Sequence, residues 1–353
     1  MDIFHNPIYR EDIDYIASLK LPWENIENSR ILITGAAGLI GSTLVDSLMA
    51  RNNAYGSQMR ITALGRDEKR AEIRFKHHWN SPLFSFVSHD IVYPMPELDD
   101  VDYIIHAASN THPVAYASDP IGTIKTNVFG TYNLLEYAVK KTSTRFVLLS
   151  TVEIYGENIG ETDRFGESDM GYIDCNTLRA GYPESKRAGE ALCNAFSAQF
   201  NVDVVIPRLC RIYGPAMLEG DSKAASQFIR NAVSGKDIVL KSEGNQIYSF
   251  CYSADAVSAL LHIILLGKSG EAYNAADPNS DISLKKLAEL LAVISGTRVA
   301  LELPSELEAQ GFSKATRALL DPAKINALGW TARDTIESGL TKTVAVLKGA
   351  ADL

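Results

Sequence analysis

Residues 31–41 read ILITGAAGLIG, an apolar run that passes directly into three glycines spaced three residues apart. The apolar part is typical of a buried strand, and residues 39–51 have the pattern of a helix, so the glycines occupy a strand-to-helix turn. In such a turn Gly35 permits the tight bend, Gly38 lets the backbone approach a pyrophosphate, and Gly41 lets the helix pack closely on the sheet. The helix N-terminus then faces the phosphates. The stretch therefore predicts a dinucleotide-binding turn.

Short apolar runs alternate with helical patterns on the C-terminal side of this turn. Apolar strands without a period of two are buried on both faces, and strands separated by helices form a parallel sheet through right-handed crossovers. The sequence therefore predicts an α/β fold, a doubly wound parallel sheet of the Rossmann type with helices on both faces. The expected later strands are 60–65, 101–108, 145–151 and 203–209, and the expected long helices are 124–141 and 181–200.

The alternation of apolar runs and helical patterns begins after residue 28 and changes after about residue 215, so we expect the chain to have three parts. Residues 1–28 form an N-terminal helical extension, because Ile13, Ile16 and Leu19 are close to helical spacing. We expect this helix to pack on the outside of the fold, with a dimer contact as the alternative. Residues 29–214 form the dinucleotide-binding domain with the catalytic residues. Residues 215–353 form mainly a smaller C-terminal substrate-binding lobe over the carboxyl end of the sheet.

Composition argues against several classes of protein. The 353 residues carry a net charge of −9 without a block of Lys or Arg, so nothing attracts a nucleic-acid backbone. The sequence has neither a signal-peptide pattern nor a run of about 18 apolar residues, which argues against a membrane protein. The four cysteines are scattered, which favours a reduced, cytoplasmic protein. The seven histidines show no metal-ligand spacing, so we predict no metal site.

A second motif, GYPESKR at 181–187, carries a candidate acid–base pair. Tyr182 and Lys186 are four residues apart and share one face of a helix. A free tyrosine has a pKa of about 10, and a neighbouring ammonium together with a positive nicotinamide ring would lower it. Tyr182 could then accept a proton from a substrate hydroxyl while a cofactor accepts hydride. Thr151, at the end of a predicted strand, is placed to bond the reacting hydroxyl, whereas Ser150 is expected to be satisfied by the backbone.

The end of the second predicted strand bears on cofactor choice. An acidic residue there would bond the ribose 2′-hydroxyl of NAD, but the sequence has Gly65 in that slot, followed by Arg66. An arginine accommodates the 2′-phosphate of NADP, so the sequence favours NADP within an NAD(P) site. Asp67, one residue further, would serve NAD instead.

Taken together, these motifs resemble the extended short-chain dehydrogenase/reductase family, which includes nucleotide-sugar epimerases, 4,6-dehydratases and decarboxylases. The spacing of ITGAAGLIG, IIHAAS (104–109), TNVFGTYNLLEYA (126–138), STVEIYG (150–156), GYPESKR and PRLCRIYGP (207–215) carries the resemblance, which runs from about residue 30 to 342. It implies a nucleotide-sugar substrate and a homodimer. It also implies a cofactor-binding set made of Gly35, Gly38, Leu39, Ile40, Gly41, Arg66, Asp90, Ile91, Ala107, Ala108, Asn127, Tyr182, Lys186 and Pro207.

Family members oxidise the sugar at C4, and the resemblance makes the residues after Thr151 decide the fate of the resulting ketone. Dehydratases typically read Thr-Asp-Glu and decarboxylases Thr-Ser-Glu, whereas this chain has Val152 before Glu153. On an extended strand Glu153 would leave on the same side as Thr151, toward the substrate. We therefore predict Glu153 to be the base that removes the C5 proton, with a structural carboxylate as the alternative.

Two departures from the family concern the substrate. Tyr248 stands where relatives have an arginine that grips the substrate diphosphate and, in the decarboxylase branch, assists decarboxylation, and Arg211 stands in an asparagine slot. Both are predicted to bind substrate, and Arg211 could supply the missing phosphate contact.

The sequence thus predicts an enzyme, an NAD(P)-dependent nucleotide-sugar epimerase/dehydratase acting through a 4-keto sugar. A 4,6-dehydratase or related C5-deprotonating enzyme is the first expectation, followed by a UDP-glucuronate decarboxylase-like enzyme and a 4-epimerase. A net NADPH-dependent carbonyl reductase is an alternative from another enzyme class. A non-enzymatic dinucleotide-binding regulator is the remaining alternative, although the Tyr182–Lys186 pair argues against it.

Overall fold

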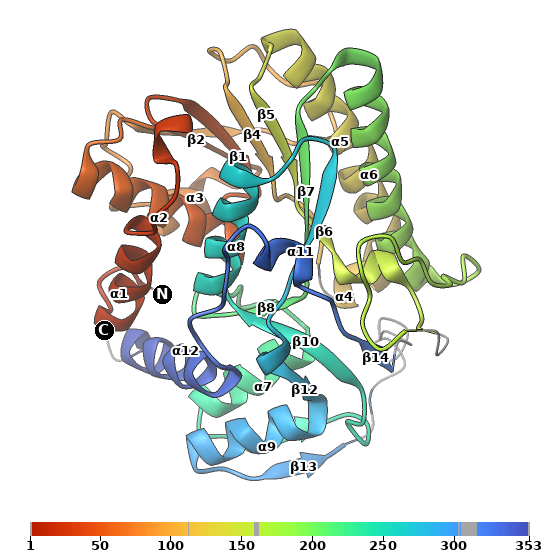
Figure 1. Cartoon of the computed structure of the whole chain (residues 1–353). Coiled ribbons are helices and arrows are strands. Elements are labelled where there is room, and N and C mark those ends of the chain that lie inside the picture. Colours follow the sequence, from red (N-terminus) through yellow and green to blue (C-terminus); the bar gives the residue numbers. More distant parts are fainter. Residues whose placement is uncertain (1, 112, 159–161, 303, 305–315, 352–353) are drawn as a thin grey trace.

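A parallel sheet with strand order β11-β7-β5-β4-β1-β2-β3 forms the middle layer of the larger lobe, and β6 pairs with β7 beyond the end of β5 (Figure 1). The structure is a computed structural model that describes residues 2–111, 113–158, 162–302, 304 and 316–351. The strands are β1 (Arg30–Thr34), β2 (Arg60–Gly65), β3 (Phe84–Ser88), β4 (Tyr103–His106), β5 (Arg145–Leu148), β6 (Ser150–Thr151), β7 (Val204–Leu209) and β11 (Glu271–Ala275).

Both faces of this sheet are buried, which explains the apolar strands without alternation. In β1, Ile31 and Ile33 belong to one hydrophobic cluster and Leu32 to another on the opposite face. In β5, Val147 likewise belongs to the first of these clusters and Phe146 to the second. The predicted doubly wound α/β fold is therefore confirmed.

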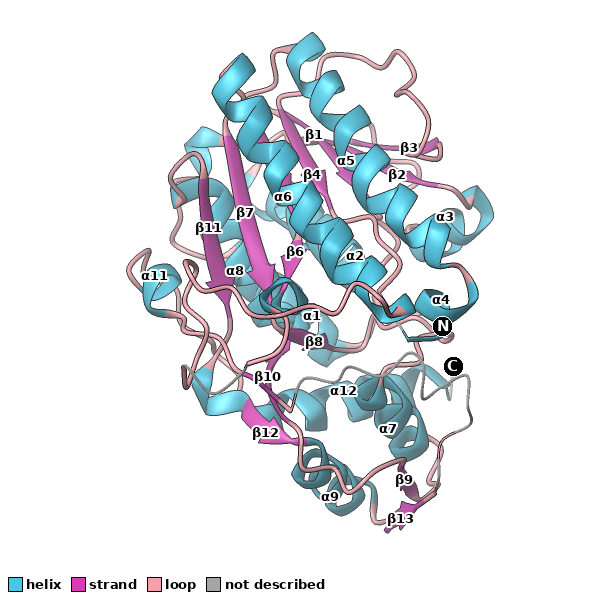
Figure 2. Cartoon of the chain, turned by 90° about the vertical axis from the view of Figure 1, so that its right-hand side faces the viewer, coloured by secondary structure: helices cyan, strands magenta, loops and turns pink. Residues whose placement is uncertain are grey.

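Helices cover the two faces in pairs. On one face α5 (Pro120–Lys141) lies beside α6 (Gly181–Phe200), as Figure 2 shows. The other face carries α2 (Leu39–Tyr55) and α8 (Ser253–Leu266), which contact each other. Shorter helices are α3 (Glu68–Arg74), α4 (Pro113–Ser118) and α11 (Ala323–Asn326), with 3-10 turns at Trp23–Asn25, Val152–Tyr155, Leu178–Ala180 and Pro278–Ser280. No helix in the described part of the chain is long and apolar enough to cross a membrane.

The second, smaller lobe lies below the carboxyl end of the sheet in Figure 1. It is built around β10 (Ile247–Tyr252), which pairs with β8 (Arg211–Tyr213), β12 (Asp281–Ser283) and β14 (Arg317–Ala318). Its other elements are α7 (Ala224–Val233), β9 (Ile238–Leu240), α9 (Leu284–Ser295), β13 (Val299–Leu301) and α12 (Ile336–Ala351). The two lobes do not separate at residues 214/215 as predicted. Helix α8 and strand β11 come after this position in the sequence but belong to the main sheet and its helical cover.

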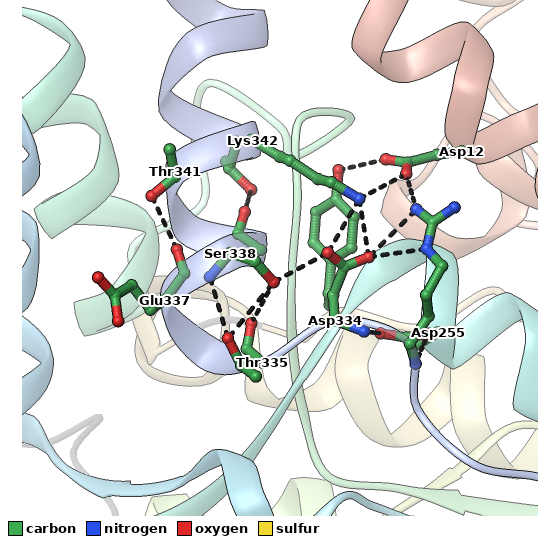
Figure 3. Close-up of polar contacts among 12 residues, drawn as sticks. Asp12, Asp255, Asp334, Thr335, Glu337, Ser338, Thr341 and Lys342 are labelled. Atoms are coloured by element: carbon green, nitrogen blue, oxygen red, sulfur yellow. Dashed lines mark hydrogen bonds and ion pairs between the residues drawn. The ribbon is translucent and has the colours of Figure 1, made fainter.

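The N-terminal segment is tied to both parts through a buried carboxylate. Helix α1 (Pro7–Ala17) packs on α2 and α8 and buries Asp12, Ile13 and Ile16. Asp12 accepts hydrogen bonds from the Tyr252 hydroxyl at 2.6 Å and from Lys342 Nζ at 3.2 Å (Figure 3). Since Tyr252 ends β10 and Lys342 lies in α12, one charge network joins three distant segments of the chain.

Candidate active site

The glycine turn has the backbone that its sequence predicts. Gly35 has φ +64°, and a Cβ atom there would lie 2.7 Å from the backbone of Ala108. At Gly41 a Cβ would lie 2.6 Å from the carbonyl oxygen of Gly35, so the start of α2 packs directly on the turn. Gly38 precedes α2 and offers no side-chain acceptor to the N–H groups of its first turn. Those N–H groups, at the positive end of the helix dipole, suit a phosphate.

The end of β2 places Arg66 and Asp67 in different roles. Asp67 caps α3, because its Oδ1 accepts the backbone N–H of Arg70 at 3.0 Å. The Arg66 side chain is 68% exposed, and its Nη1 lies 3.9 Å from Oδ2 of Asp90. Arg66 is thus the residue at this strand end whose side chain can turn toward a ligand.

Other members of the predicted cofactor set are packed into the fold. Asn127 is buried and accepts a 2.7 Å hydrogen bond from Ser109 while donating to the Ser185 hydroxyl at 2.9 Å. It therefore joins the end of β4 to α5 and α6. The Ile91 side chain is buried against Gly130, where a Cβ would lie 2.6 Å from it. Ala107 and Ala108 follow β4, Leu39 and Ile40 begin α2, and Pro207 lies in β7.

Three of the four predicted catalytic residues meet at the carboxyl edge of the sheet. Thr151 ends β6, and its hydroxyl lies close enough to Tyr182, in the first turn of α6, to lower the pKa of that tyrosine. Lys186 lies one turn further, is 3% exposed, and donates from Nζ to the carbonyl of Leu149 at 2.8 Å. The sequence placed these residues on the correct elements, and Pro183 lies in the first turn of α6.

The pKa values of this pair are set mainly by burial. Burial raises the pKa of Tyr182 to about 12, against smaller lowering effects of the Thr151 hydrogen bond and the Arg179 charge. Burial also lowers the pKa of Lys186 to about 8, which the charge of Glu190 opposes. The expected lowering of the Tyr182 pKa is therefore absent in the chain alone. The reason is that desolvation of the phenolate outweighs the favourable contacts.

Glu153 does not lie on an extended strand, so the alternation argument for its direction was wrong. The backbone enters a 3-10 turn at Val152, and Thr151 Oγ1 accepts the N–H of Glu153 at 3.3 Å. Val152 is buried in the core. The Glu153 carboxylate still reaches the site, where it accepts from Arg179 Nη2 at 2.6 Å and from Arg211 Nη2 at 3.4 Å. Burial raises its pKa, but the two guanidinium groups together hold it below its ordinary value.

Arg211 and Tyr248 lie together, across the end of the sheet from α6. The Arg211 guanidinium carbon is 3.4 Å from the centroid of the Tyr248 ring, a cation–π contact between β8 and β10. Arg211 therefore points to Glu153 and the tyrosine ring. The sequence placed it at a substrate diphosphate instead, and this geometry puts its charge beside the catalytic residues.

Two residues of this site were missed in the sequence. Arg179 lies three residues before Tyr182, with its guanidinium 4.6 Å from the ring of Tyr116 and 5.9 Å from the ring of Tyr182. The rings of Tyr116 and Tyr182 stack at 4.9 Å. A signal for Arg179 was available, because a cation just before a helix N-terminus opposes the helix dipole. Tyr116, in α4, gave none.

Unsatisfied donors and a small cavity adjoin Glu153. Within the described residues, Arg179 Nε, Arg179 Nη1 and Arg211 Nη1 are buried without a hydrogen-bond partner. A cavity of about 70 Å³ is lined by Glu153, Tyr172, Thr177, Arg179 and Pro183, among others. A water molecule occupies about 30 Å³ in the liquid, so this space fits a group of a few atoms. Buried N–H donors without partners favour an anionic group there.

A possible metal-ligand group in the described residues lies outside this set. Asp2, His5 and His77 offer ligand atoms within 4.8 Å of one another. Asp2 already accepts from Lys76 at 2.7 Å and contacts His77 Nε2 at 3.2 Å, which accounts for its position. The absence of a metal from the active site stays a prediction.

Comparison with known proteins places the chain among dinucleotide-dependent sugar enzymes. The model of the NAD-dependent epimerase/dehydratase family matches residues 31–276. UDP-glucuronic acid decarboxylase 4 of Arabidopsis thaliana is 32% identical over 312 residues, covering 88% of this chain and 67% of that protein. UDP-glucuronic acid decarboxylase 1 of Xenopus tropicalis is 32% identical over 318 residues, covering 90% and 72%.

Solved structures give the same fold. The dTDP-glucose 4,6-dehydratase DesIV of Streptomyces venezuelae, with NAD bound, has a TM-score of 0.79 at 26% identity, covering 92% of this chain and 98% of that one. The UDP-glucuronic acid 4-epimerase of Bacillus cereus, in complex with UDP-glucuronic acid and NAD, has a TM-score of 0.77 at 22% identity, covering 91% and 99%. The second likeness shows the fold alone.

Proposed function

This chain is an enzyme of the NAD-dependent epimerase/dehydratase family, the extended short-chain dehydrogenases, and on that premise we propose that it decarboxylates a nucleotide-linked hexuronic acid. The observation that carries the proposal is the clamp on Glu153. Arg179 and Arg211 hold this carboxylate, yet both arginines keep buried donors without partners, and Arg179 and Glu153 line a cavity that fits a carboxylate. The three charges sum to +1, so the site can accept one further anion.

An NAD-type dinucleotide fits the glycine turn. The uncapped first turn of α2 can receive its pyrophosphate, and Asn127, Ala107 and Ala108 lie at the neighbouring edge of the sheet. NAD in the solved structure of DesIV supports this class of cofactor. We further propose that NADP is preferred, because Arg66 is exposed at the end of β2 whereas Asp67 is used as a helix cap. The cofactor supplies the acceptor, and later the donor, of the C4 hydride.

The chain's own residues move the proton and fix the sugar. Tyr182 accepts the proton of the sugar 4-hydroxyl, and Thr151 orients that hydroxyl. The Lys186 ammonium stabilises the phenolate that Tyr182 must become, because the two charges lie on one face of α6.

Decarboxylation follows from the 4-ketone without a base at C5. A ketone at C4 stands β to the C6 carboxylate, so the C5–C6 bond can break with its electron pair passing into the C4 carbonyl. Carbon dioxide leaves, a solvent proton adds at C5, and hydride returns to C4. Tyr182 and Thr151 are the donors placed to stabilise the enolate oxygen during this step. Arg179 and Arg211 hold the carboxylate until it leaves.

Dehydration is the second candidate, and it was the first expectation from the sequence. It is favoured by the place of Glu153, whose charge is close enough to raise the pKa of Tyr182. Two observations weigh against it. A carboxylate with two guanidinium partners and a lowered pKa is a weak base. Val152, buried in the core, stands where a dehydratase would have the acid that protonates the departing 6-hydroxyl, although it also stands where decarboxylases have a serine.

The two candidates separate in one experiment. The protein is incubated with UDP-glucuronic acid, UDP-glucose and dTDP-glucose, and the product masses are measured. A product lighter by one carbon dioxide, from the uronic acid alone, supports decarboxylation. A product lighter by one water from a neutral sugar replaces it with dehydration, and unchanged mass with an altered sugar indicates epimerisation. Stoichiometric consumption of added NADPH would indicate the net reductase instead.

We also propose that the chain forms a homodimer through the outer face of α5 and α6. Ile121, Ile124 and Phe129 of α5 and Phe200 of α6 are exposed on these paired helices. Large apolar side chains gathered on one face are typical of subunit contacts. Light scattering of wild type and of Phe129→Asp tests this, since a dimer should dissociate in the variant. A cytoplasmic location stays a prediction.

A further inference from the structure

We propose that Glu190, clamped by Arg208, is a positioning residue that keeps Lys186 charged and holds the Ser150–Thr151 strand end in place. The proposal rests on the catalytic roles given above to Tyr182 and Lys186. It gives Glu190 and Arg208, which lie behind these two residues, a role that the sequence motifs do not indicate.

Arg208 holds Glu190 from one side, and each of its three guanidinium nitrogens donates hydrogen bonds. Arg208, in β7, donates from Nη2 to Oε2 of Glu190 at 2.7 Å and from Nε to both carboxylate oxygens at 3.2 and 3.3 Å. Its Nη1 donates to the Glu167 carbonyl at 2.6 Å and to the Tyr155 hydroxyl at 3.0 Å. Both members of the pair are buried. A bidentate pair with this many fixed partners leaves the carboxylate one position.

The opposite side of the carboxylate holds the catalytic strand end. The Ser150 hydroxyl donates to Oε1 of Glu190, so the backbone satisfaction expected for Ser150 was wrong. Ser150 is the residue before Thr151 in β6, and β6 pairs with β7, which carries Arg208. The Glu190–Arg208 pair therefore bridges the strand of the catalytic hydroxyl and its neighbour.

Glu190 also lies one helical turn after Lys186, on the same face of α6. Lys186 is buried, and Nζ donates to the neutral carbonyl of Leu149. The other titratable groups that act on Lys186 or feel its charge are Cys193 of α6 and His106 of β4. Burial raises the pKa of Cys193 and lowers that of His106 to about 3, so both are neutral. Among the described residues, Glu190 is thus the anion that acts on the ammonium.

The far side of the pair opens into a cleft of about 510 Å³. Its lining includes Glu167, Glu190, Asn194, Arg208, Glu271 and Lys324. A small anion can therefore reach the position of the Glu190 carboxylate from solvent. This opening permits a chemical rescue, in which formate replaces the carboxylate that a truncation removes.

The test compares pH profiles of kcat/KM. In Glu190→Gln the alkaline limb should move to lower pH by about one unit, because the ammonium loses its neighbouring anion. Glu190→Ala should show the same shift, and formate should reverse it. Glu167→Gln, which alters another carboxylate of the same cleft, should keep the wild-type limb. A folded Glu190→Gln with a wild-type limb overturns the proposal.

A variant with both charges removed covers the case in which Glu190→Gln does not fold. Glu190→Gln/Arg208→Met leaves no unpaired charge in the interior, and its limb should move in the same direction. An unmoved limb in that variant also overturns the proposal. The results also distinguish failure of the proposal for Glu190 from failure of the proposed function. If Tyr182→Phe stays active, the catalytic assignment is lost; if it is inactive and the limb does not move, only the role of Glu190 is lost.

Discussion

Arg179 donates a 2.6 Å hydrogen bond to Glu153, while its guanidinium extends over the ring of Tyr182. This contact places a cation, a carboxylate and the proposed catalytic tyrosine within one small volume. It makes Glu153 a poor base, and it makes Arg179 a strong candidate for binding an acidic substrate group.

Arg179→Met should therefore weaken binding of the acidic substrate selectively. Loss of hydrogen bonds to a charged group costs about 1.5–3 kcal/mol, so KM for UDP-glucuronic acid should rise about tenfold to a hundredfold. UDP-glucose, which is neutral at C6, serves as the control ligand. Its inhibition constant should change less than about twofold. Equal losses for both ligands would show that Arg179 supports the site without contacting the carboxylate.

Tyr182→Phe should retain cofactor binding and lose about two to four orders of magnitude in kcat, the usual contribution of a general acid–base group. Steady-state kinetics at neutral pH measure this. Tyr55→Phe removes the hydroxyl of an exposed tyrosine at the end of α2 and is the matched control. Activity of Tyr182→Phe near that of wild type would contradict the mechanism.

The pH dependence should follow Lys186. Its pKa is lowered by burial to about 8, and the protonated form is the active one. The value of kcat/KM should therefore be retained below that pKa and fall as pH rises through about 8. Tyr182 must lose its proton before it can accept one, so it sets the acid limb, and the positive nicotinamide ring of the bound cofactor lowers its pKa from about 12 in the chain alone. An activity that still rises between about pH 8 and 10 would show that Lys186 acts in its neutral form.

The sequence sufficed for features that depend on local pattern. The strand–turn–helix at Gly35–Gly41, the strand end at Thr151 and the helix carrying Tyr182 and Lys186 each lie within one continuous segment. Their residue types follow from burial, turn geometry and helical spacing, which act over a few positions.

Features that depend on distant pairing were beyond the sequence. Glu153 was assigned to an extended strand because the residue types of Thr151, Val152 and Glu153 do not indicate a 3-10 turn. Its partners Arg179 and Arg211 come from separate elements, and the return of α8 and β11 to the main sheet is a matter of topology. Ser150 was given a backbone partner because Glu190 lies 40 residues away. Ion pairs and hydrogen bonds between residues so far apart in the sequence produce no periodic pattern from which they could be predicted.

Cofactor choice should follow Arg66. Arg66→Ala should weaken NADP binding much more than NAD binding, because only NADP has a 2′-phosphate for the guanidinium to pair with. Titration of tryptophan or nicotinamide fluorescence gives both dissociation constants. Arg70→Ala, an exposed arginine in α3, is the control and should change neither. If the two affinities fall equally in Arg66→Ala, Asp67 becomes the better candidate for cofactor selection.

The proposed role of the two arginines beside Glu153 is to hold a carboxylate that the reaction removes. UDP-glucuronic acid labelled with carbon-13 at C6 reports on this step itself, with release of labelled carbon dioxide followed during turnover. We expect wild type to release the label, form a nucleotide pentose and consume no added dinucleotide. A label that stays in the sugar product, or turnover confined to neutral nucleotide hexoses, would contradict the proposed decarboxylation.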